Sequence, residues 1–136
     1  MSWIYNEELL LEIPEGYYGF VYNITNIQSN RQYIGKKLFF AQKHRQVKGK
    51  KKKFKVESDW KEYFGSSEEL KKDVELLGNE AFSRKILHLC KTKGECSYYE
   101  AKYQFQENVL LFPELYYNSW IMCKVHRKHL KLSDAG

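Results

Sequence analysis

The chain has 136 residues, of which 43% are apolar, and this fits one domain with one hydrophobic core that needs no disulfide or structural metal. No stretch reaches the roughly eighteen apolar residues of a membrane span, and the acidic N-terminal segment lacks the basic start of a signal peptide. The three cysteines form no CxxC pair, so we expect reduced thiols in a cytoplasmic protein, in the host cytoplasm if a phage encodes it.

The net charge of +6 is unevenly distributed. Residues 31–61 hold twelve Lys or Arg and two acids, a local balance of +10, so the rest of the chain carries −4. Such a surface suits a polyanion such as the phosphate backbone of a duplex. For the segment KGKKKKFK alone, a solvated or disordered lysine loop is an equally good interpretation, and a nuclear import signal would look the same.

The first half of the chain predicts a hairpin followed by a basic insert. Residues 3–13 are an apolar lead-in that ends at Pro14. Residues 18–26 alternate and are rich in aromatic and β-branched side chains, which predicts a strand, and a turn at 28–30 leads to a second strand at 31–40. The basic insert at 43–56 is expected to be a loop or a ragged hairpin.

The second half predicts helices around a third strand. A helical pattern begins at Asp59, and a clearer helix follows Ser66 or Ser67, with Glu69 placed for a capping box on Ser66 and Gly78 as its end. A strand at 82–89, a helix at 97–111 and a short strand or helix at 116–126 complete the order. Trp60, Tyr63 and Trp120 are expected in the core. The sequence thus predicts a small α/β domain with a short sheet.

Tyr22 and Tyr33 are the first candidates for chemistry. They share a face of the hairpin only if the turn sets the register that way, and cross-strand packing is the more common role of such a pair. A phenol has a pKa near 10, which nearby cations lower, and Lys36, Lys37 and Arg45 follow Tyr33 closely. A phenol, a lysine and an arginine together suit activation of water against a phosphodiester.

Glu100 is the candidate metal ligand, because phosphodiester cleavage needs the phosphate charge neutralised, usually by a carboxylate-bound metal. Ser97-x-x-Glu100 also fits a capping box, and from spacing alone the cap is the favoured interpretation unless the helix begins before Ser97. No second carboxylate lies at short spacing, so one hard cation that keeps most of its waters is expected rather than a two-metal site.

The ordered series resembles the GIY-YIG nuclease superfamily, in particular the short stand-alone endonucleases of bacteriophages. Phe20-Val21-Tyr22 occupies the place of the first motif, and Tyr33-Ile34-Gly35 is an intact YIG. Residues 65–87 resemble the family's segment of helix, glycine, phenylalanine and strand, and Tyr117-Asn118 resembles the closing asparagine. The resemblance runs from about Tyr18 to Asn118, within a single domain of residues 1–136 that ends in a short basic tail at 124–136.

The resemblance implies a three-stranded antiparallel sheet flanked by helices and divalent-metal-dependent DNA cleavage. Glu100 would hold one Mg²⁺ or Mn²⁺ ion, Tyr22 or Tyr33 would position or deprotonate the attacking water, and Asn118 would support the site. Lys37 resembles a lysine that restriction-enzyme relatives place just beyond YIG. Arg45 is the choice for the family arginine, with Lys43 and His44 as rivals. The residues expected to bind DNA, in duplex form, are Lys36, Lys43, His44, Lys48, Lys50, Lys51, Lys52, Lys53 and Lys55.

Departures from the pattern leave other functions open. Phe20 replaces the first-motif glycine, and only eighteen residues follow Asn118, too few for the C-terminal recognition domain of many homing relatives. A non-catalytic nucleic-acid-binding module with the same fold is the main alternative, and a lysine loop that docks on an acidic partner is a weaker one. One active site cuts one strand, so a double-strand break would need a homodimer or sequential nicking.

Overall fold

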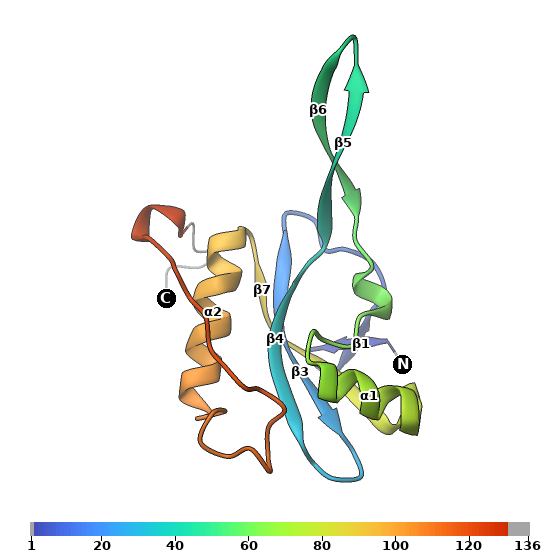
Figure 1. Ribbon diagram of the computed structural model, residues 1–136, viewed down its shortest axis with the longest axis vertical. Coiled ribbons are helices and arrows are strands. Elements are labelled where there is room, and N and C mark those ends of the chain that lie inside the picture. Colours follow the sequence, from blue (N-terminus) through green and yellow to red (C-terminus); the bar gives the residue numbers. More distant parts are fainter. Residues whose placement is uncertain (1, 131–136) are drawn as a thin grey trace.

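The computed structural model describes residues 2–130, and its centre is a five-stranded sheet in the order β2–β1–β7–β3–β4 (Figure 1). The strands are β1 (Trp3–Tyr5), β2 (Glu8–Leu10), β3 (Gly19–Asn26), β4 (Gln32–Leu38) and β7 (Phe82–Cys90). Strands β7, β3 and β4 pair antiparallel, as expected, but β1 joins β7 in parallel and brings β2 with it. The prediction of a three-stranded antiparallel sheet therefore covers only part of the sheet, which has five strands and is mixed.

The two additional strands come from the segment that the sequence marked only as an apolar lead-in. Asn6 and Glu7 have positive φ angles of 49° and 68°, the geometry of a two-residue hairpin turn. This pair lacks the glycine that usually marks such a turn in a sequence. Trp3 anchors the hairpin, since it is 1% exposed and its indole N–H donates to the carbonyl of Trp60 over 2.6 Å.

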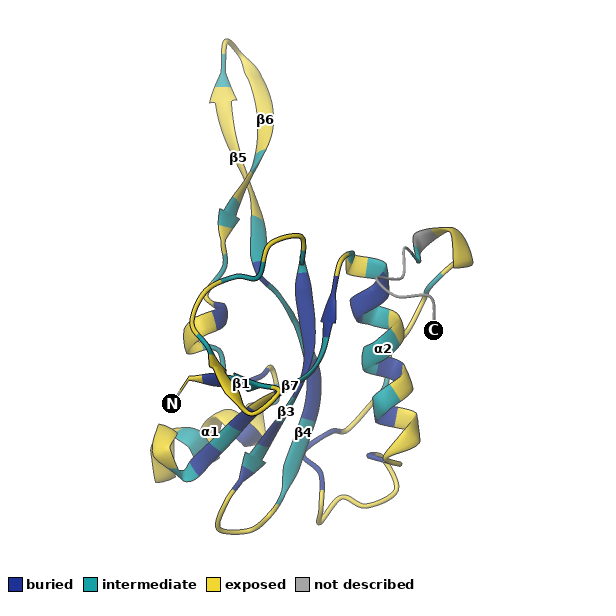
Figure 2. Ribbon diagram, turned by 180° about the vertical axis from the view of Figure 1, so that it is seen from behind, coloured by how far each residue is buried: buried dark blue, intermediate teal, exposed yellow. Residues whose placement is uncertain are grey.

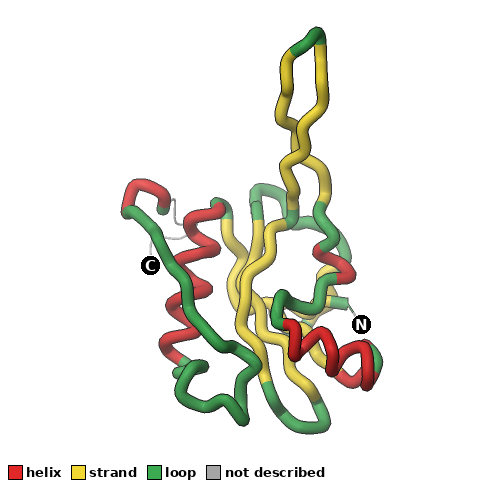
Figure 3. The backbone as a smooth tube through the Cα atoms, viewed as in Figure 1, coloured by secondary structure: helices red, strands yellow, loops and turns green. Residues whose placement is uncertain are grey.

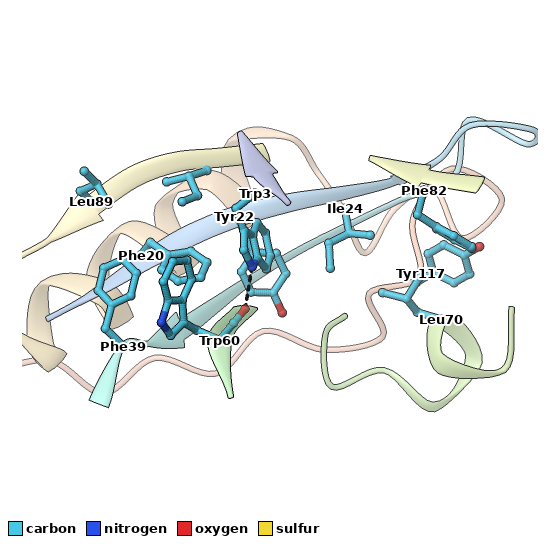
Figure 4. Close-up of a cluster of buried hydrophobic side chains, with 11 residues drawn as sticks. Trp3, Phe20, Tyr22, Ile24, Phe39, Trp60, Leu70, Phe82, Leu89 and Tyr117 are labelled. Carbon is cyan, nitrogen blue, oxygen red and sulfur yellow. Dashed lines mark hydrogen bonds between the residues drawn. The ribbon is translucent and has the colours of Figure 1, made fainter. Parts of the chain in front are cut away.

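An apolar layer lies on each face of the sheet. A helix lies on each side of the sheet (Figure 3). On one face, the 3-10 turn η1 (Trp60–Glu62) places Trp60 beside Phe20, and α1 (Glu68–Leu77) places Leu70 at the other end of the same cluster, beside Tyr117 (Figure 4). On the other face, α2 (Lys93–Gln106) covers Val21 and Ile34. Successive residues of a strand point to opposite faces, so β3 supplies both layers from neighbouring positions.

Helix α1 begins and ends where its sequence signals predict. Ser67 is the N-cap, and its hydroxyl accepts the N–H of Leu70, while Gly78 ends the helix with a φ of 90°. The capping box of Glu69 on Ser66 is wrong, because Glu69 instead forms an ion pair with Arg31. A 3-10 turn, η2 (Asn79–Ala81), then leads into β7.

Helix α2 begins four residues before its predicted start and ends five residues before its predicted end. Thr92 is the N-cap, and its hydroxyl accepts the N–H of Glu95 in a Thr-x-x-Glu pattern. The sequence predicted a loop here because Gly94 lies within this pattern. At the other end Asn108 takes a φ of 54°, which stops the helix. The expected strand or helix at 116–126 is also wrong: it contains one bridge, between Gln32 and Tyr116, and otherwise no regular structure before η3 (Arg127–His129).

The basic insert forms a projecting two-stranded ribbon (Figure 1), which answers the question of loop or hairpin. Strands β5 (Phe40–Val47) and β6 (Lys50–Glu57) pair antiparallel around a turn in which Lys48 and Gly49 both have positive φ. Figure 2 shows that the ribbon is mostly exposed.

Within the described part of the chain, no helix is long and apolar enough to cross a membrane. Positions 131–136 of the predicted basic tail lie outside the described residues.

Candidate active site

Tyr22 and Tyr33 lie on the same face of the sheet. The register places Tyr22 opposite Gly35 and Ile24 opposite Tyr33, so the two tyrosines are diagonal neighbours on β3 and β4. Their ring centroids are 6.2 Å apart. Gly35 permits this arrangement, because a Cβ at that position would lie 2.5 Å from the Tyr22 hydroxyl oxygen.

Two residues between η1 and α1 complete a cluster of hydroxyl groups around these tyrosines. Tyr63 packs against Tyr22 with ring centroids 6.0 Å apart, and the Tyr33 hydroxyl hydrogen bonds to Ser66 Oγ over 2.8 Å. Buried Arg84 holds this segment by donating to the Tyr63 carbonyl over 2.8 Å. The sequence predicted Tyr63 as core and Ser66 as a helix cap, because neither has a local pattern that indicates this role.

Both phenols are held in their protonated form at neutral pH. Burial raises the pKa of Tyr22 well above its ordinary value, and the nearby phenols Tyr63 and Tyr33 raise it further. Burial also raises the pKa of Tyr33, although the hydrogen bond with Ser66 opposes this. The expected lowering of these pKa values by nearby cations is therefore wrong, because desolvation is the larger effect.

Glu100 projects from α2 toward the same region. Because the helix begins at Lys93, the alternative of a Ser97–Glu100 cap is wrong, and the Ser97 hydroxyl accepts from Lys36 Nζ over 2.7 Å instead. Burial raises the pKa of the Glu100 carboxyl, while the charge and the backbone N–H of Lys36 lower it. The negative charge of Glu100 in turn contributes to the raised pKa values of Tyr22 and Tyr33.

Tyr33 and Glu100 meet at a cleft of about 480 Å³ beside the edge strand β4. The lining includes Tyr33, Ser66, Glu100, Asn118, Trp120 and Met122. Tyr22 does not line the cleft and is 1% exposed, so it lies behind Tyr33. The tyrosine that reaches the open space is therefore Tyr33.

Asn118 closes the outer edge of β4. Its side-chain oxygen accepts the N–H of Ile34 over 3.1 Å, and its amide nitrogen donates to the Ile34 carbonyl over 2.8 Å. Gln104 donates to the same carbonyl over 2.9 Å. Asn118 thus replaces a strand neighbour and holds the backbone between Tyr33 and Gly35 in place.

The predicted cations lie in three different places. Lys36 is beside Glu100, whereas Lys37 points to the opposite face, where its Nζ is 2.6 Å from Asp59 and 4.1 Å from the centre of the Tyr63 ring. Arg45 is on the ribbon, opposite Lys52, with its guanidinium over the ring of Phe54. The structure does not bring Arg45 to the cleft, and its rivals Lys43 and His44 are on the ribbon too, with the other basic residues of the insert.

A single divalent cation fits the residues of the cleft. Among residues 2–130, no group of three or more His, Cys, Asp or Glu side chains is arranged to hold a metal ion. Glu100 is a half-buried carboxylate on the cleft and forms no ion pair with the residues that the structure describes. One hard oxygen ligand of this kind suits Mg²⁺ that keeps most of its waters, and a cation would relieve the cost of desolvating the carboxylate.

Comparison with known proteins identifies one family. The model of the family described as "Putative endonuclease segE, GIY-YIG domain" matches residues 3–121, which extend from β1 to the segment that lines the cleft. This match confirms the resemblance found from the motifs. No curated protein and no solved structure shows a significant match.

Proposed function

The chain belongs to the GIY-YIG endonuclease domain family of segE, and from this premise we propose that it is a divalent-metal-dependent DNA endonuclease that hydrolyses phosphodiester bonds at the cleft beside β4. The observation that supports the proposal best is the convergence of Tyr33 and Glu100, from a strand and a helix far apart in sequence, on one open cleft. A fold kept only for binding would not need a desolvated carboxylate beside a phenol.

Glu100 is proposed to hold one Mg²⁺ or Mn²⁺ ion, which would neutralise the charge that develops on the phosphate. Tyr33 reaches the cleft and positions the attacking water by a hydrogen bond, while Ser66 fixes the direction of its hydroxyl. Because the pKa of Tyr33 is raised, its neutral hydroxyl orients the water rather than acting as a preformed base. Tyr22 supports Tyr33 from behind, next to Tyr63.

The lysines of the site are proposed to have two separate roles. Lys36 lies beside Glu100, where its charge favours the carboxylate form, while its Nζ donates to the Ser97 hydroxyl. Lys37 forms an ion pair with Asp59, and its ammonium group lies over the ring of Tyr63. Lys37 therefore acts on the site by stabilising Tyr63 in the tyrosine cluster. Asn118 fixes the β4 backbone that carries Tyr33.

The ribbon β5–β6 is proposed to bind the backbone of duplex DNA. Its residues 40–56 carry no acid. Its basic residues are all exposed, namely Lys43, His44, Arg45, Lys48, Lys50, Lys51, Lys52, Lys53 and Lys55. A two-stranded ribbon fits the major groove, and lysines along it can reach phosphates on both sides. Arg45 is assigned to these contacts. A homodimer would supply the second active site for a double-strand break.

The test is nicking of supercoiled plasmid DNA in Mg²⁺ and in EDTA. We expect nicked circles from the wild type only with metal, and a loss of at least ~100-fold in rate for Glu100→Gln and for Tyr33→Phe, since each removes a group that contacts reacting atoms or the metal. Glu75→Gln and Tyr98→Phe are matched controls on α1 and α2, outside the cleft lining. Equal nicking by the wild type and both site variants would contradict the assigned site. Salt-sensitive DNA binding without any cleavage would favour the non-catalytic module.

A further inference from the structure

Trp120 is exposed at the mouth of the cleft. The segment that carries it is attached on both sides, by Asn118 at the edge of β4 and by Ile121, which packs with the apolar layer under α2. Trp120 and Met122 point the other way, are 69% and 66% exposed, and line the cleft that contains Glu100. The prediction of Trp120 as a core residue is therefore wrong.

The other two tryptophans show that this exposure is specific to one site. Trp3 is 1% exposed and Trp60 is 0% exposed. A large aromatic surface left in water is unfavourable by itself, and in a cleft beside polar groups it typically marks a ligand with a flat apolar face. A nucleotide combines a charged phosphate with such a face. Trp120 offers a surface for the base, and Glu100 lines the same cleft, where the metal ion of the proposed function would bind the phosphate.

We propose that Trp120 stacks on a nucleobase of the DNA, next to the phosphodiester at Glu100. This inference rests on the proposed function, because it assumes that DNA occupies the cleft. Stacking on an aromatic side chain is tolerant of sequence, since every base has a π face. Trp120 would thus position the scissile nucleotide, while the ribbon holds the backbone elsewhere.

The stacking has a consequence for the substrate. A base inside a duplex is already stacked on its neighbours, so Trp120 reaches it only where that base is unstacked or unpaired. Pyrimidine–purine steps and mismatched bases cost the least to open. The enzyme should therefore prefer DNA that is readily opened at the site of cleavage over uniformly stacked duplex.

Tryptophan fluorescence tests the proposal without cleavage. In EDTA, the protein is titrated with duplex DNA that contains one mismatch and, in parallel, with inorganic polyphosphate, a polyanion that has no bases. We expect DNA to quench the emission and polyphosphate to leave it nearly unchanged. Trp120→Phe should lose the quenching, because the remaining tryptophans Trp3 and Trp60 are buried.

Affinity for the same labelled DNA, measured by anisotropy, provides a second readout. Trp120→Ala should weaken binding about 10-fold, with an unchanged slope of log affinity against log salt, because stacking releases no counterions. Tyr98→Ala removes an exposed aromatic outside the cleft lining and should have no effect. The salt slope separates loss of stacking from a general weakening of charge contacts.

Equal quenching by polyphosphate and by DNA would overturn the inference, and so would wild-type DNA affinity in Trp120→Ala. A third contrary result is tryptophan emission that changes with protein concentration in the absence of DNA, because the protein then dimerises and Trp120 contacts the second copy. The plasmid assay is independent of these. Quenching by DNA without nicking in Mg²⁺ would support stacking and reject the endonuclease activity. Nicking without quenching would support the endonuclease activity and reject stacking.

Discussion

Replacing Gly35 with alanine is expected to destabilise the protein and to abolish cleavage. A Cβ at this position would lie 2.5 Å from Oη and 2.7 Å from Cζ of Tyr22, and 2.9 Å from Cε2 of Tyr33. Gly35 is within β4 and does not have a positive φ, so its backbone accepts alanine without strain. Any loss of stability must therefore come from the contact with the two tyrosine rings.

The size of the effect follows from how little Tyr22 can move. It is 1% exposed, and its ring packs against Trp3 and Tyr63 with centroids 5.2 and 6.0 Å away. Overfilling a packed core costs about 1–3 kcal/mol, and alanine in place of glycine within a strand returns roughly 0.5–1 kcal/mol. A net loss of about 1–2 kcal/mol corresponds to a fall in Tm of roughly 4–8 °C for a domain of this size.

Thermal unfolding followed by circular dichroism measures this fall, and the plasmid assay at 25 °C measures activity while the variant is still folded. The double variant Gly35→Ala with Tyr22→Phe is the control, because it removes the closest oxygen but retains the ring. It should recover part of the Tm, as expected for two positions that interact directly. If Gly35→Ala alone melts at the wild-type temperature, the ring of Tyr22 does not lie over Gly35 and the geometry described for the site is incorrect.

Three further predictions concern charge and hydrogen bonding. Glu100→Gln should raise Tm at pH 8 in EDTA, because the pKa of Glu100 is raised on folding, so its favourable contribution at low pH is lost as pH rises through the folded pKa. The difference in Tm between the variant and the wild type should shrink in acid, and Mg²⁺ should raise the Tm of the wild type alone. Equal Tm values of both proteins at pH 8 would refute the prediction. Asn118→Ala should cost about 1–3 kcal/mol, because it leaves the Ile34 N–H without its acceptor, and should speed hydrogen exchange of that amide; an unchanged exchange rate would contradict the role of Asn118. Replacing Lys51, Lys53 and Lys55 with glutamine should reduce the slope of log affinity for DNA against log salt by up to roughly 3, because each phosphate that a lysine no longer neutralises removes about 0.9. The same change at Lys71, Lys72 and Lys102, on α1 and α2, should leave the slope unchanged. Equal slopes in both triple variants would show that the ribbon does not bind DNA.

Features that depend on neighbouring residues were predictable. The alternation of residues 18–26 and the turn after them predict β3 and β4, and Ser67 and Gly78 mark the ends of α1 as capping chemistry requires. The Tyr33-Ile34-Gly35 motif and the order of the downstream motifs indicated the family that the comparison confirms. Where a local signal was masked, as at Thr92 by Gly94, the predicted boundary was wrong by several residues.

Features that depend on contacts between distant residues were not predictable. The pairing of β1 with β7 joins segments about 80 residues apart, and nothing local in either strand specifies its partner. The exposure of Trp120 is similar, because its composition suits a core and only the attachment of Asn118 and Ile121 to the rest of the fold turns it outward.

By itself, the sequence determined the residue types of the site, most of the secondary structure and the family, because periodicity, capping and motif order are properties of the chain. Tertiary structure decided the register that puts Tyr22 and Tyr33 on one face, the placement of Glu100 beside them and the separation of Lys36 from Lys37. The physical reason is that strand register and helix packing are set by the fit of whole surfaces. A shift of one residue would turn a tyrosine to the opposite face of the sheet.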